Sequence, residues 1–472
     1  MRLFFFLLFP ALLLGQQERP NIVFLLVDDL GWGDFGCYGA EFYETPNIDR
    51  LAKEGMLFTD GYAACTVCSP TRGALLTGCY PARTHLTDWI AGHAHPYAKL
   101  SVPAWTTKIE HDRITLPEAL KKGGYSTGFF GKWHLMPIGK PDFEMHYPTD
   151  HGFDLNAGGR EWGQPKGRGR YFSPFDMPGL PDGEKGSYLT DQLTDEALDF
   201  IDKKKANPFF LYFSYYTLHG PLMAPEPLVE KYRQKAKGFH NSRRQNTHPV
   251  RAAMVEKLDD SVGRILKKLD DFGISDNTIV ILTGDNGGNY ADTSGGLQGY
   301  KGFSHEGGVR VPLIAKLPGM IPANTTSRVP VISMDFYPTL LSLAGLPARP
   351  DQHQDGVDVS AVLKDPKASL KRERLFWHYP HYHRTKPYAA IRRGDWKLIE
   401  FFETGKTELY DLSRDRGERV DQAAAHQQIV MGLKGDLHAW QKSVGAQMMS
   451  DNPNYDPKKA AERVKKKKRR KK

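Results

Sequence analysis

Three stretches of this chain are almost entirely apolar, and each stops abruptly at polar residues. They are residues 21–27 (NIVFLLV), 208–216 (PFFLYFSYY) and 278–282 (TIVIL). A strand with one face in water alternates polar and apolar residues, so runs of this kind predict strands that are buried on both faces. Such strands belong to parallel sheets that helices cover on both sides. We therefore expect the chain to fold around a large, mainly parallel sheet.

Helical patterns alternate with these runs. Residues 46–54 begin with Pro46 and end before Gly55, and apolar residues recur at three- and four-residue steps between Met254 and Leu269. This alternation predicts an α/β sandwich around a large mixed, mainly parallel central sheet. Further strands are expected at 125–130 and 310–317, and further helices from Thr115 (with Glu118 closing a capping box), at 191–204 and at 335–344.

The pattern changes near residue 371. Short alternating runs at 375–379, 388–402 and 408–412, with a turn at 392–395, predict a smaller subdomain with an antiparallel sheet. A helix over 420–442 is expected to close it. We thus expect a catalytic domain over residues 16–370, a C-terminal subdomain over 371–450, and a disordered basic tail over 451–472, which is rich in Pro, Asn and Lys.

Nearly all of the net charge of +9 lies in that tail. Residues 458–472 hold eleven Lys or Arg and one Glu, which leaves the rest of the chain at −1. A run of like charges can contact nucleic acid or another anionic surface. For an exported protein we expect only weak affinity for polyanions and no nucleic-acid partner.

The first fifteen residues have the order of a signal peptide. Arg2 is followed by the apolar residues 3–14, which only Pro10 interrupts, and by the small residue Gly15. The run is too short to span a membrane, which takes about 20 apolar residues. We expect a secreted or periplasmic protein with no membrane span.

Polar side chains follow the predicted strands at their carboxyl ends, which is where α/β sheets bind ligands. A single Asp at such a place means little, but four strand ends that all supply metal-ligand or acid–base groups indicate one composite site. These residues are Asp28, Asp29, Lys132, His134, His219, Asp285 and Asn286.

The segment around Cys68 predicts the start of a helix. Pro70 suits a first helical turn, Ser69 is a candidate cap, and Gly78 ends the helix. Free backbone N–H groups and the positive end of the helix dipole favour an anion beside Cys68, and Arg72 lies on the next turn. The simpler interpretation of Cys68 is a structural thiol, or a thiol of low pKa, at a helix start.

Cys68-Ser-Pro-Thr-Arg72, followed by Gly73, Thr77 and Gly78, resembles the signature of the type I sulfatases, which are sulfuric ester hydrolases. The resemblance extends over most of the chain and implies an alkaline-phosphatase-like sandwich. It also implies that a formylglycine-generating maturation enzyme oxidises Cys68 to Cα-formylglycine. The aldehyde of that residue hydrates, and one hydroxyl of the gem-diol attacks sulfur.

Two pairs of residues resemble the metal ligands of that family. Asp28-Asp29 follows the first predicted strand, and Asp285-Asn286 lies in Thr-Gly-Asp-Asn-Gly-Gly, with position 68 completing the set. Their oxygen donors suit one Ca²⁺ ion and disfavour Zn²⁺, which prefers His or Cys.

Other family motifs imply further roles. In Gly-Lys-Trp-His, Lys132 holds sulfate or formylglycine oxygens, and His134 is the base that deprotonates the second hydroxyl of the gem-diol. His219, in His-Gly-Pro, lies near the leaving-group oxygen, and Lys301 is the second sulfate-binding lysine, although Tyr300 stands where the family often has Gly. Arg72 supports the same anion. We assign His305 a structural role.

The substrate is less constrained. Export and the motifs Asp-Gly-Val-Asp358 and Glu-Leu-Tyr-Asp-Leu412 resemble sulfatases that act on sulfated polysaccharides or their oligosaccharides. Sugar sites use aromatic platforms and polar hydrogen-bonding groups. Candidates of these types in predicted loops are Trp89, Arg160, Trp162, His378, His381 and His383.

Two other functions remain open. A phosphatase or phosphodiesterase of the same superfold usually presents Ser or Thr as nucleophile and binds two zinc ions, which Cys68 and the lack of extra His ligands near Asp285 disfavour. A non-catalytic receptor for sulfated glycans would keep Cys68 as a thiol.

Four cysteines are too few for a disulfide scaffold, and we expect Cys37, Cys65 and Cys79 to be reduced.

Overall fold

The computed structural model describes residues 19–139, 143–242 and 244–470, with side chains up to residue 463. The predicted signal peptide, residues 1–15, lies outside these ranges. Within them, no helix is both long and apolar enough to cross a membrane. The described cysteines are all free, as expected for Cys37, Cys65 and Cys79.

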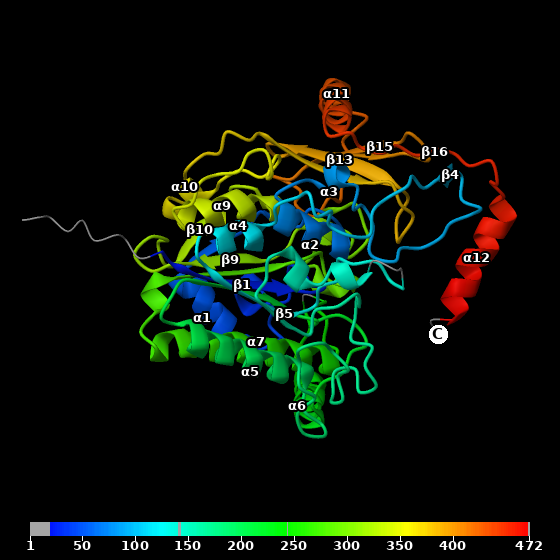
Figure 1. The fold of residues 1–472 in the computed structure, drawn as a ribbon. Helices are drawn as coiled ribbons and strands as arrows, with labels where there is room; N and C mark the ends of the chain where they lie inside the picture. Colours follow the sequence, from blue (N-terminus) through cyan, green and yellow to red (C-terminus); the bar gives the residue numbers. More distant parts are fainter. Residues whose placement is uncertain (1–18, 140–142, 243, 471–472) are drawn as a thin grey trace, which may run out of the picture.

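The centre of the molecule is a mixed sheet (Figure 1). All neighbouring strands are parallel except for the two pairs that β9 makes, which confirms the predicted mainly parallel sheet. In order across the sheet the strands are β10 (Thr325–Ser327), β2 (Met56–Phe58), β9 (Leu313–Lys316), β8 (Thr278–Gly284), β1 (Asn21–Val27), β7 (Phe209–Ser214), β5 (Ser126–Gly131) and β6 (Leu155–Ala157).

Helices cover both faces of this sheet (Figure 1). Because successive side chains of a strand point to opposite faces, Val23 and Leu25 of β1 join one apolar core, and Phe24 and Leu26 join the other. One face carries α1 (Pro46–Glu54), α5 (Leu189–Lys204), α6 (Glu226–Gly238) and α7 (Pro249–Asp271), and the other carries α2 (Cys68–Thr77), α4 (Leu116–Lys122), α9 (Phe336–Leu343) and α10 (Ser360–Lys364).

A separate antiparallel sheet forms the expected smaller unit. Its strands, in order, are β12 (Arg374–Tyr379), β13 (Tyr388–Arg393), β14 (Trp396–Phe401) and β15 (Thr407–Asp411), and α11 (Gln427–Ser443) packs on it. The buried Lys397 ties this sheet to the larger unit by pairing with Glu306 (2.8 Å), and it also pairs with Glu418 (2.9 Å). The short elements are β3 (Gly61–Tyr62), α3 (Pro81–Thr84), β4 (Leu100–Ser101), α8 (Glu306–Val309) and β11 (Val331–Ile332).

Helix α11 begins later than the predicted residue 420. Turns occupy the preceding segment, where the Asp415 carboxylate accepts the N–H groups of Arg419 and Val420, at 2.6 and 2.9 Å. Aspartate competes with the helix for backbone donors in this way, so the regular helix starts only at Gln427.

The expectation of a disordered tail is wrong for its first part. Strand β16 (Ser450–Asp451) pairs with β4, and α12 (Pro457–Arg470) follows it. The Asp456 carboxylate accepts the N–H groups of Lys458 and Lys459, each at 3.0 Å, and Pro457 occupies the first helical position. Alanine, glutamate and lysine are good helix formers, so a segment without apolar periodicity still forms a helix here.

Candidate active site

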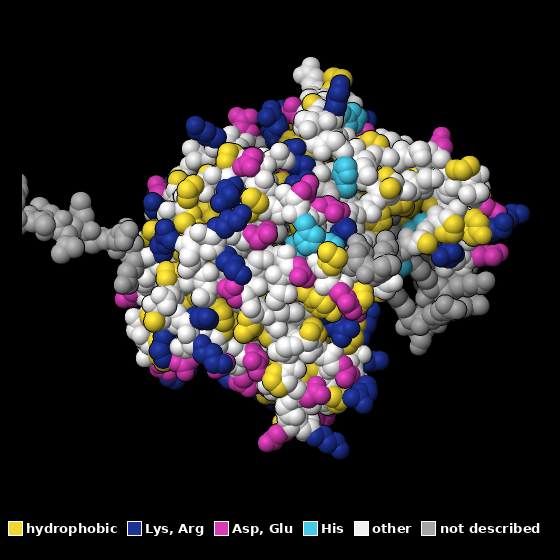
Figure 2. Space-filling view, in the orientation of Figure 1, with side chains coloured by type: hydrophobic (Ala, Val, Ile, Leu, Met, Phe, Trp, Pro, Cys, Tyr) yellow, Lys and Arg dark blue, Asp and Glu magenta, His cyan; other side chains and the backbone are white. Residues whose placement is uncertain are grey.

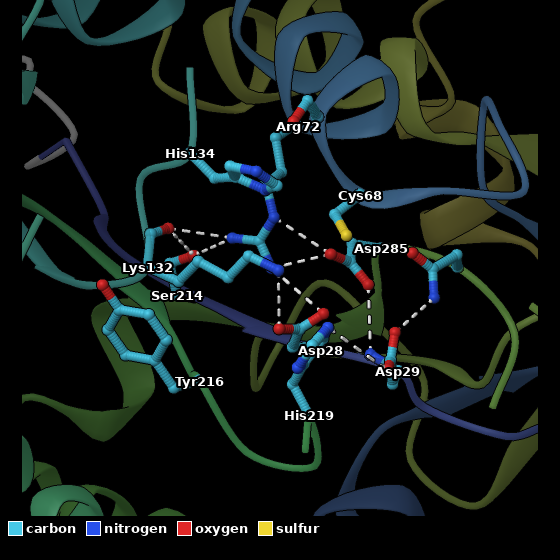
Figure 3. Close-up of polar contacts among 12 residues, drawn as sticks. Asp28, Asp29, Cys68, Arg72, Lys132, His134, Ser214, Tyr216, His219 and Asp285 are labelled. Atoms are coloured by element: carbon cyan, nitrogen blue, oxygen red, sulfur yellow. Dashed lines mark hydrogen bonds and ion pairs between the residues drawn. The ribbon is translucent and has the colours of Figure 1, made fainter. Parts of the chain in front are cut away.

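The polar residues predicted to share one site do come together (Figure 3). Strands β8, β1, β7 and β5 are consecutive and parallel, and their registers align Val27 with Gly284, Leu26 with Ser214, and Ser214 with Gly131. The residues that follow each strand therefore leave the sheet along the same edge. Asp28 and Asp29 follow β1, Lys132 and His134 follow β5, His219 follows β7, and Asp285 and Asn286 follow β8.

Cys68 is the first residue of α2, and Gly78 ends that helix in a left-handed conformation with φ of 66°. The cap, however, is not Ser69. Val67 is the N-cap residue, and the Ser69 hydroxyl accepts the N–H of Ile90 at 3.2 Å. Because no side chain of the described residues caps α2, the N–H groups of its first turn are available to an anion beside Cys68.

The Cys68 thiol is only 3% exposed. Lys301 donates from Nζ to Sγ at 3.4 Å. Burial raises the pKa of Cys68, against the opposing charges of Lys132 and Lys301. In the absence of a bound cation, burial therefore favours the protonated thiol over the thiolate, which is the reactive form.

Four buried side chains surround a cluster of oxygen atoms beside Cys68. Asp28, Asp29, Asp285 and Asn286 are all fully buried. The Asn286 amide donates to Asp29 Oδ1 at 2.9 Å and to the Gly287 carbonyl at 3.0 Å, so its Oδ1 is left over. Within the described part of the chain, Asp28 Oδ1, Asp29 Oδ2 and Asn286 Oδ1 accept no hydrogen bond.

These unsatisfied oxygens fit a hard cation. Buried polar atoms normally have partners, and three oxygens without one at a single place indicate an ion. Ligand atoms of Asp28, Cys68 and Asp285 also lie within 4.8 Å of one another. Oxygen donors of this kind suit Ca²⁺ better than Zn²⁺.

Three cationic side chains balance the three carboxylates. Arg72 donates from Nε and Nη2 to Asp285 Oδ2 at 2.9 and 2.7 Å, and Lys132 donates from Nζ to Asp28 Oδ2 at 2.7 Å. Lys301 donates to Asp29 Oδ1. The site thus places an arginine and two lysines around Cys68, an arrangement that can hold an oxyanion.

The pKa values of the carboxylates are shifted in opposite directions. Burial, together with the neighbouring charge of Asp28, raises the pKa of Asp285 to about 6. Burial also acts to raise the pKa of Asp29, but the charges of Lys301, His219 and Lys132 outweigh it and hold that pKa below its ordinary value. A cation among them would favour the ionised form of both.

The ring of His134 has one nitrogen free for a proton. Nε2 is hydrogen-bonded to the carbonyl oxygen of Ile90, which can only accept, so Nε2 carries the hydrogen and Nδ1 the lone pair. Among the described residues, Nδ1 has no partner. Burial, with the charge of Lys132, lowers the pKa of His134 well below its ordinary value, so the ring is neutral at pH 7.

His219 lies on the more open side of the site, with 19% of its side chain exposed. Its Nδ1 donates to the Gly220 carbonyl at 2.8 Å, and its Nε2 lies 3.9 Å from Asp29 Oδ2. Burial and the charge of Lys301 lower the pKa of His219 to about 3. It too is a neutral imidazole with its lone pair toward the charged cluster.

The sequence reasoning did not find Ser214 and Asp88. Ser214 ends β7, and its hydroxyl donates to the Lys132 carbonyl at 2.6 Å while it accepts a hydrogen bond from Arg72. Buried Asp88 accepts the Tyr379 hydroxyl at 2.6 Å and the Trp89 N–H at 2.9 Å, which holds the loop whose Ile90 carbonyl orients His134. For Ser214 the strand-end position was an available signal, whereas Asp88 had none.

Four of the six proposed sugar contacts lie near this site. The Arg160 guanidinium stacks 3.6 Å over the Trp162 ring, and the Arg160 carbonyl accepts the His134 N–H at 3.0 Å. Trp89 precedes Ile90. His383 packs against Gly302, where an added Cβ would come within 2.0 Å of the ring.

The structure does not bring the other two into the site. His378 is buried on the face of β12 that α11 covers, where Gln441 donates to its Nδ1 (3.1 Å) and its Nε2 donates to the Gln447 carbonyl (2.9 Å). His381 is buried against Thr87, with its Nε2 at 2.8 Å from the hydroxyl. Both side chains, which the sequence analysis proposed as substrate contacts, thus lie in packed positions rather than in an open loop.

These two buried histidines predict an acid-sensitive fold. Burial lowers the pKa of His378 to about 4 and that of His381 to about 3. In the unfolded chain each titrates near pH 6.5, so between that pH and the folded value the unfolded state binds more protons. We expect the free energy of unfolding to be highest above pH 6.5, where neither state binds these protons. On acidification below pH 6.5 it should fall by up to about 1.4 kcal/mol per pH unit for each histidine.

Urea titrations at pH 7, 6 and 5 check this pH dependence. In His381→Gln the free energy of unfolding should fall by about 1–2 kcal/mol less between pH 7 and pH 5 than it does in the parent protein. The exposed His240, replaced by glutamine, serves as the control and should leave the decline unchanged. An identical decline in His381→Gln and in the parent protein would contradict the assignment.

Comparisons with known proteins place this site in a family. The family model described as Sulfatase matches residues 20–346, and that described as N-sulphoglucosamine sulphohydrolase, C-terminal, matches residues 298–443. A protein of Formosa agariphila named sulfatase is 33% identical, over 93% of this chain and 92% of its own. The N-acetylgalactosamine-6-sulfatase of Rattus norvegicus is 38% identical, over 88% of this chain and 78% of its own.

Solved structures agree with the sequence matches. The crystal structure of Ps i-CgsB superposes with a TM-score of 0.74 at 28% identity, covering 93% of this chain and 95% of that one. Since one family model spans well over half of the chain and relatives above 30% identity span most of it, this protein belongs to the sulfatase family and is a sulfuric ester hydrolase.

Proposed function

We propose that this chain is an exported sulfatase that hydrolyses sulfate monoesters on carbohydrates, using Cα-formylglycine made from Cys68 and one bound Ca²⁺. The observation that supports it most is the cluster of unsatisfied oxygens on Asp28, Asp29 and Asn286 beside a buried cysteine at a helix start. Export rests on the pattern of residues 1–15.

Asp28, Asp29, Asp285 and Asn286 would hold the ion. When present, formylglycine hydrate supplies a nucleophilic oxygen and Ca²⁺ supplies Lewis-acid stabilisation of the sulfate oxygens. Lys132, Lys301 and Arg72 then bind the anionic oxygens, together with the free N–H groups at the start of α2. Charge that grows on these oxygens during the reaction meets groups that are already in place.

Two histidines handle protons in this proposal. His134 takes a proton at Nδ1, the atom that its bond to the Ile90 carbonyl leaves available. A bound sulfate beside His219 raises the proton affinity of Nε2, and a proton held there is available to the leaving-group oxygen. General acid–base help of this kind is worth about 10²–10⁴-fold.

The carbohydrate class rests on the relatives. Several are named N-acetylgalactosamine-6-sulfatases, and Ps i-CgsB, 28% identical, was solved in complex with k-i-k-neocarrahexaose. In this chain Trp89, Trp162, Arg160 and His383 supply the aromatic and polar surfaces that a sugar ring uses.

Formation of formylglycine requires a maturation enzyme that reaches Cys68. Because the folded chain leaves that residue only 3% exposed, we propose that the conversion precedes folding. Chain folded without the enzyme should then stay unconverted when the enzyme is added afterwards.

Two measurements test the function. Mass spectrometry of the peptide around position 68 should find an aldehyde in place of the thiol, and sulfate release from a panel of defined sulfated mono- and oligosaccharides should identify the substrate. Aryl phosphate monoesters and diesters form the comparison set. A retained thiol with no sulfate release from any member would favour the glycan receptor, and preferred phosphate release would favour the phosphatase.

A further inference from the structure

We propose that the C-terminal arm, residues 450–463, and the loop of residues 93–101 form a second subsite that binds another anionic sugar of the same substrate chain. This inference rests on the proposed function, since it adds a binding site for neighbouring sugars of the glycan whose sulfate lies at the catalytic site. The arm is the projection that carries α12 at the side of the molecule (Figures 1 and 2).

The arm is fastened to the loop rather than free. Ser450 pairs with Ser101 and Asp451 with Leu100 in a two-stranded ladder. The Asn452 amide then donates to the carbonyls of Pro96 and Ala98, at 3.0 and 2.7 Å. These bonds set the position of the residues that follow, so a cavity between arm and loop has fixed walls.

Such a cavity lies beneath the start of α12 and has a volume of about 300 Å³. Its walls include the aromatic rings of Tyr97, Tyr382 and Tyr455 and the cationic side chains of Lys99 and Arg463. This volume is at the lower end of the range for small-molecule sites. Flat rings with a polar edge, next to positive charge, match a sugar ring that carries a sulfate.

The one acidic side chain in the cavity wall is already neutralised. Glu403 pairs with Lys386 at 2.6 Å and accepts the Tyr382 hydroxyl at 3.1 Å. Lys99 donates to the Glu403 backbone carbonyl at 2.9 Å and not to its carboxylate. The balance of charge at the cavity is therefore positive, which favours an anionic ligand.

A row of rings leads from this cavity toward Lys301 of the catalytic site. His383 packs against Gly302, the residue after Lys301. The ring centroids of His383 and His93 are 6.2 Å apart, those of His93 and His95 also 6.2 Å, and those of His95 and Tyr382 5.3 Å. A chain whose sulfate lies at Cys68 thus has a continuous path of polar rings toward the arm.

The positive charge of the tail can attract a polyanionic substrate to the arm. The sequence of residues 458–472 has a net charge of +10, and its described side chains, up to Arg463, lie at the far end of this row of rings. Clustered cations attract a polyanion and release its counterions, so the effect weakens as salt rises. This attraction adds little to the affinity for a short sulfate ester. A long sulfated chain that reaches both the catalytic site and the arm gains affinity from both.

A comparison of a small and a long substrate tests the subsite. The kcat/KM is measured for an aryl sulfate and for a defined sulfated hexasaccharide, in the parent protein, in Tyr455→Ala, in the double variant K459E/R463E and in a chain that ends at Asn454. We expect each change to lower the ratio of hexasaccharide to aryl sulfate kcat/KM at least about tenfold, with a weaker salt dependence for the hexasaccharide.

The matched control is K203E/K267E, which makes the same change of charge on exposed lysines of α5 and α7. It should leave the ratio at the parent value. An unchanged ratio of hexasaccharide to aryl sulfate kcat/KM in all three arm variants would overturn the subsite. The subsite would also be overturned if the parent protein bound duplex DNA or anionic vesicles through the arm more tightly than it binds the hexasaccharide.

The outcome separates this inference from the proposed function. If the parent protein releases no sulfate from either substrate, the proposed function fails. Titration calorimetry of the hexasaccharide against the parent and K459E/R463E then decides the subsite alone. Equal affinities would contradict it, and at least tenfold weaker binding to the variant would support it.

Discussion

Cys68→Ala is expected to abolish sulfate release, with a loss of at least about 10⁴-fold in kcat, while the protein stays folded. The residue supplies the nucleophile in the proposed reaction, and alanine offers no oxygen or sulfur in its place. The change removes one small buried group at the start of α2, so we expect only about 1 kcal/mol of lost stability. Released sulfate and the urea midpoint are measured on the same preparation.

The control for this variant is Cys65→Ala. Cys65 is also buried, three residues earlier, but lies in the apolar core beneath the antiparallel sheet and not at the oxygen cluster. We expect that variant to keep most of its activity at a similar cost in stability. Activity of Cys68→Ala near that of the parent protein would contradict the proposed mechanism.

Removal of divalent ions is expected to reduce kcat at least about 10³-fold, and Ca²⁺ should restore it better than Zn²⁺. The reason is the ligand set, since Asp28, Asp29, Asp285 and Asn286 offer only oxygen. Without a divalent charge, the carboxylates would hold Lys132 and Lys301 by ion pairs instead of leaving them to bind sulfate.

The variant Asp29→Asn tests the site without changing its shape. It should lose both bound calcium, measured by elemental analysis, and activity. Asp195→Asn, at an exposed carboxylate on α5, should keep both. Stoichiometric zinc in the purified protein, or full activity in excess chelator, would argue against the calcium site and for a phosphatase.

The residues at the strand ends show what local sequence patterns can predict. Asp28, Asp29, Asp285 and Asn286 could be placed together from the sequence, because each follows a fully apolar run and parallel strands deliver their carboxyl ends to one edge. That inference needs no knowledge of which strands are neighbours. The family motif around Cys68 then named the chemistry.

The errors have a common cause. Ser69 looked like a cap, but its hydroxyl bonds to the N–H of Ile90, twenty-one residues away in the chain. His378 was expected to contact a sugar, but β12 places it under α11, where Gln441 donates to its Nδ1. Helix α12 looked disordered because it has no apolar face, although Asp456 and its helix-forming residues suffice to start it. Each outcome depends on a partner that local periodicity does not reveal.

The sequence by itself determined the alternating strands and helices, the strand ends that carry the site and the cysteine motif, because these depend on neighbours along the chain. Only the tertiary structure decided which oxygens are left unsatisfied, which nitrogen of His134 is free, and that the C-terminal arm lies on the loop of residues 93–101. These depend on the register of strands and on contacts between residues far apart in sequence, and such contacts form only when the chain is packed.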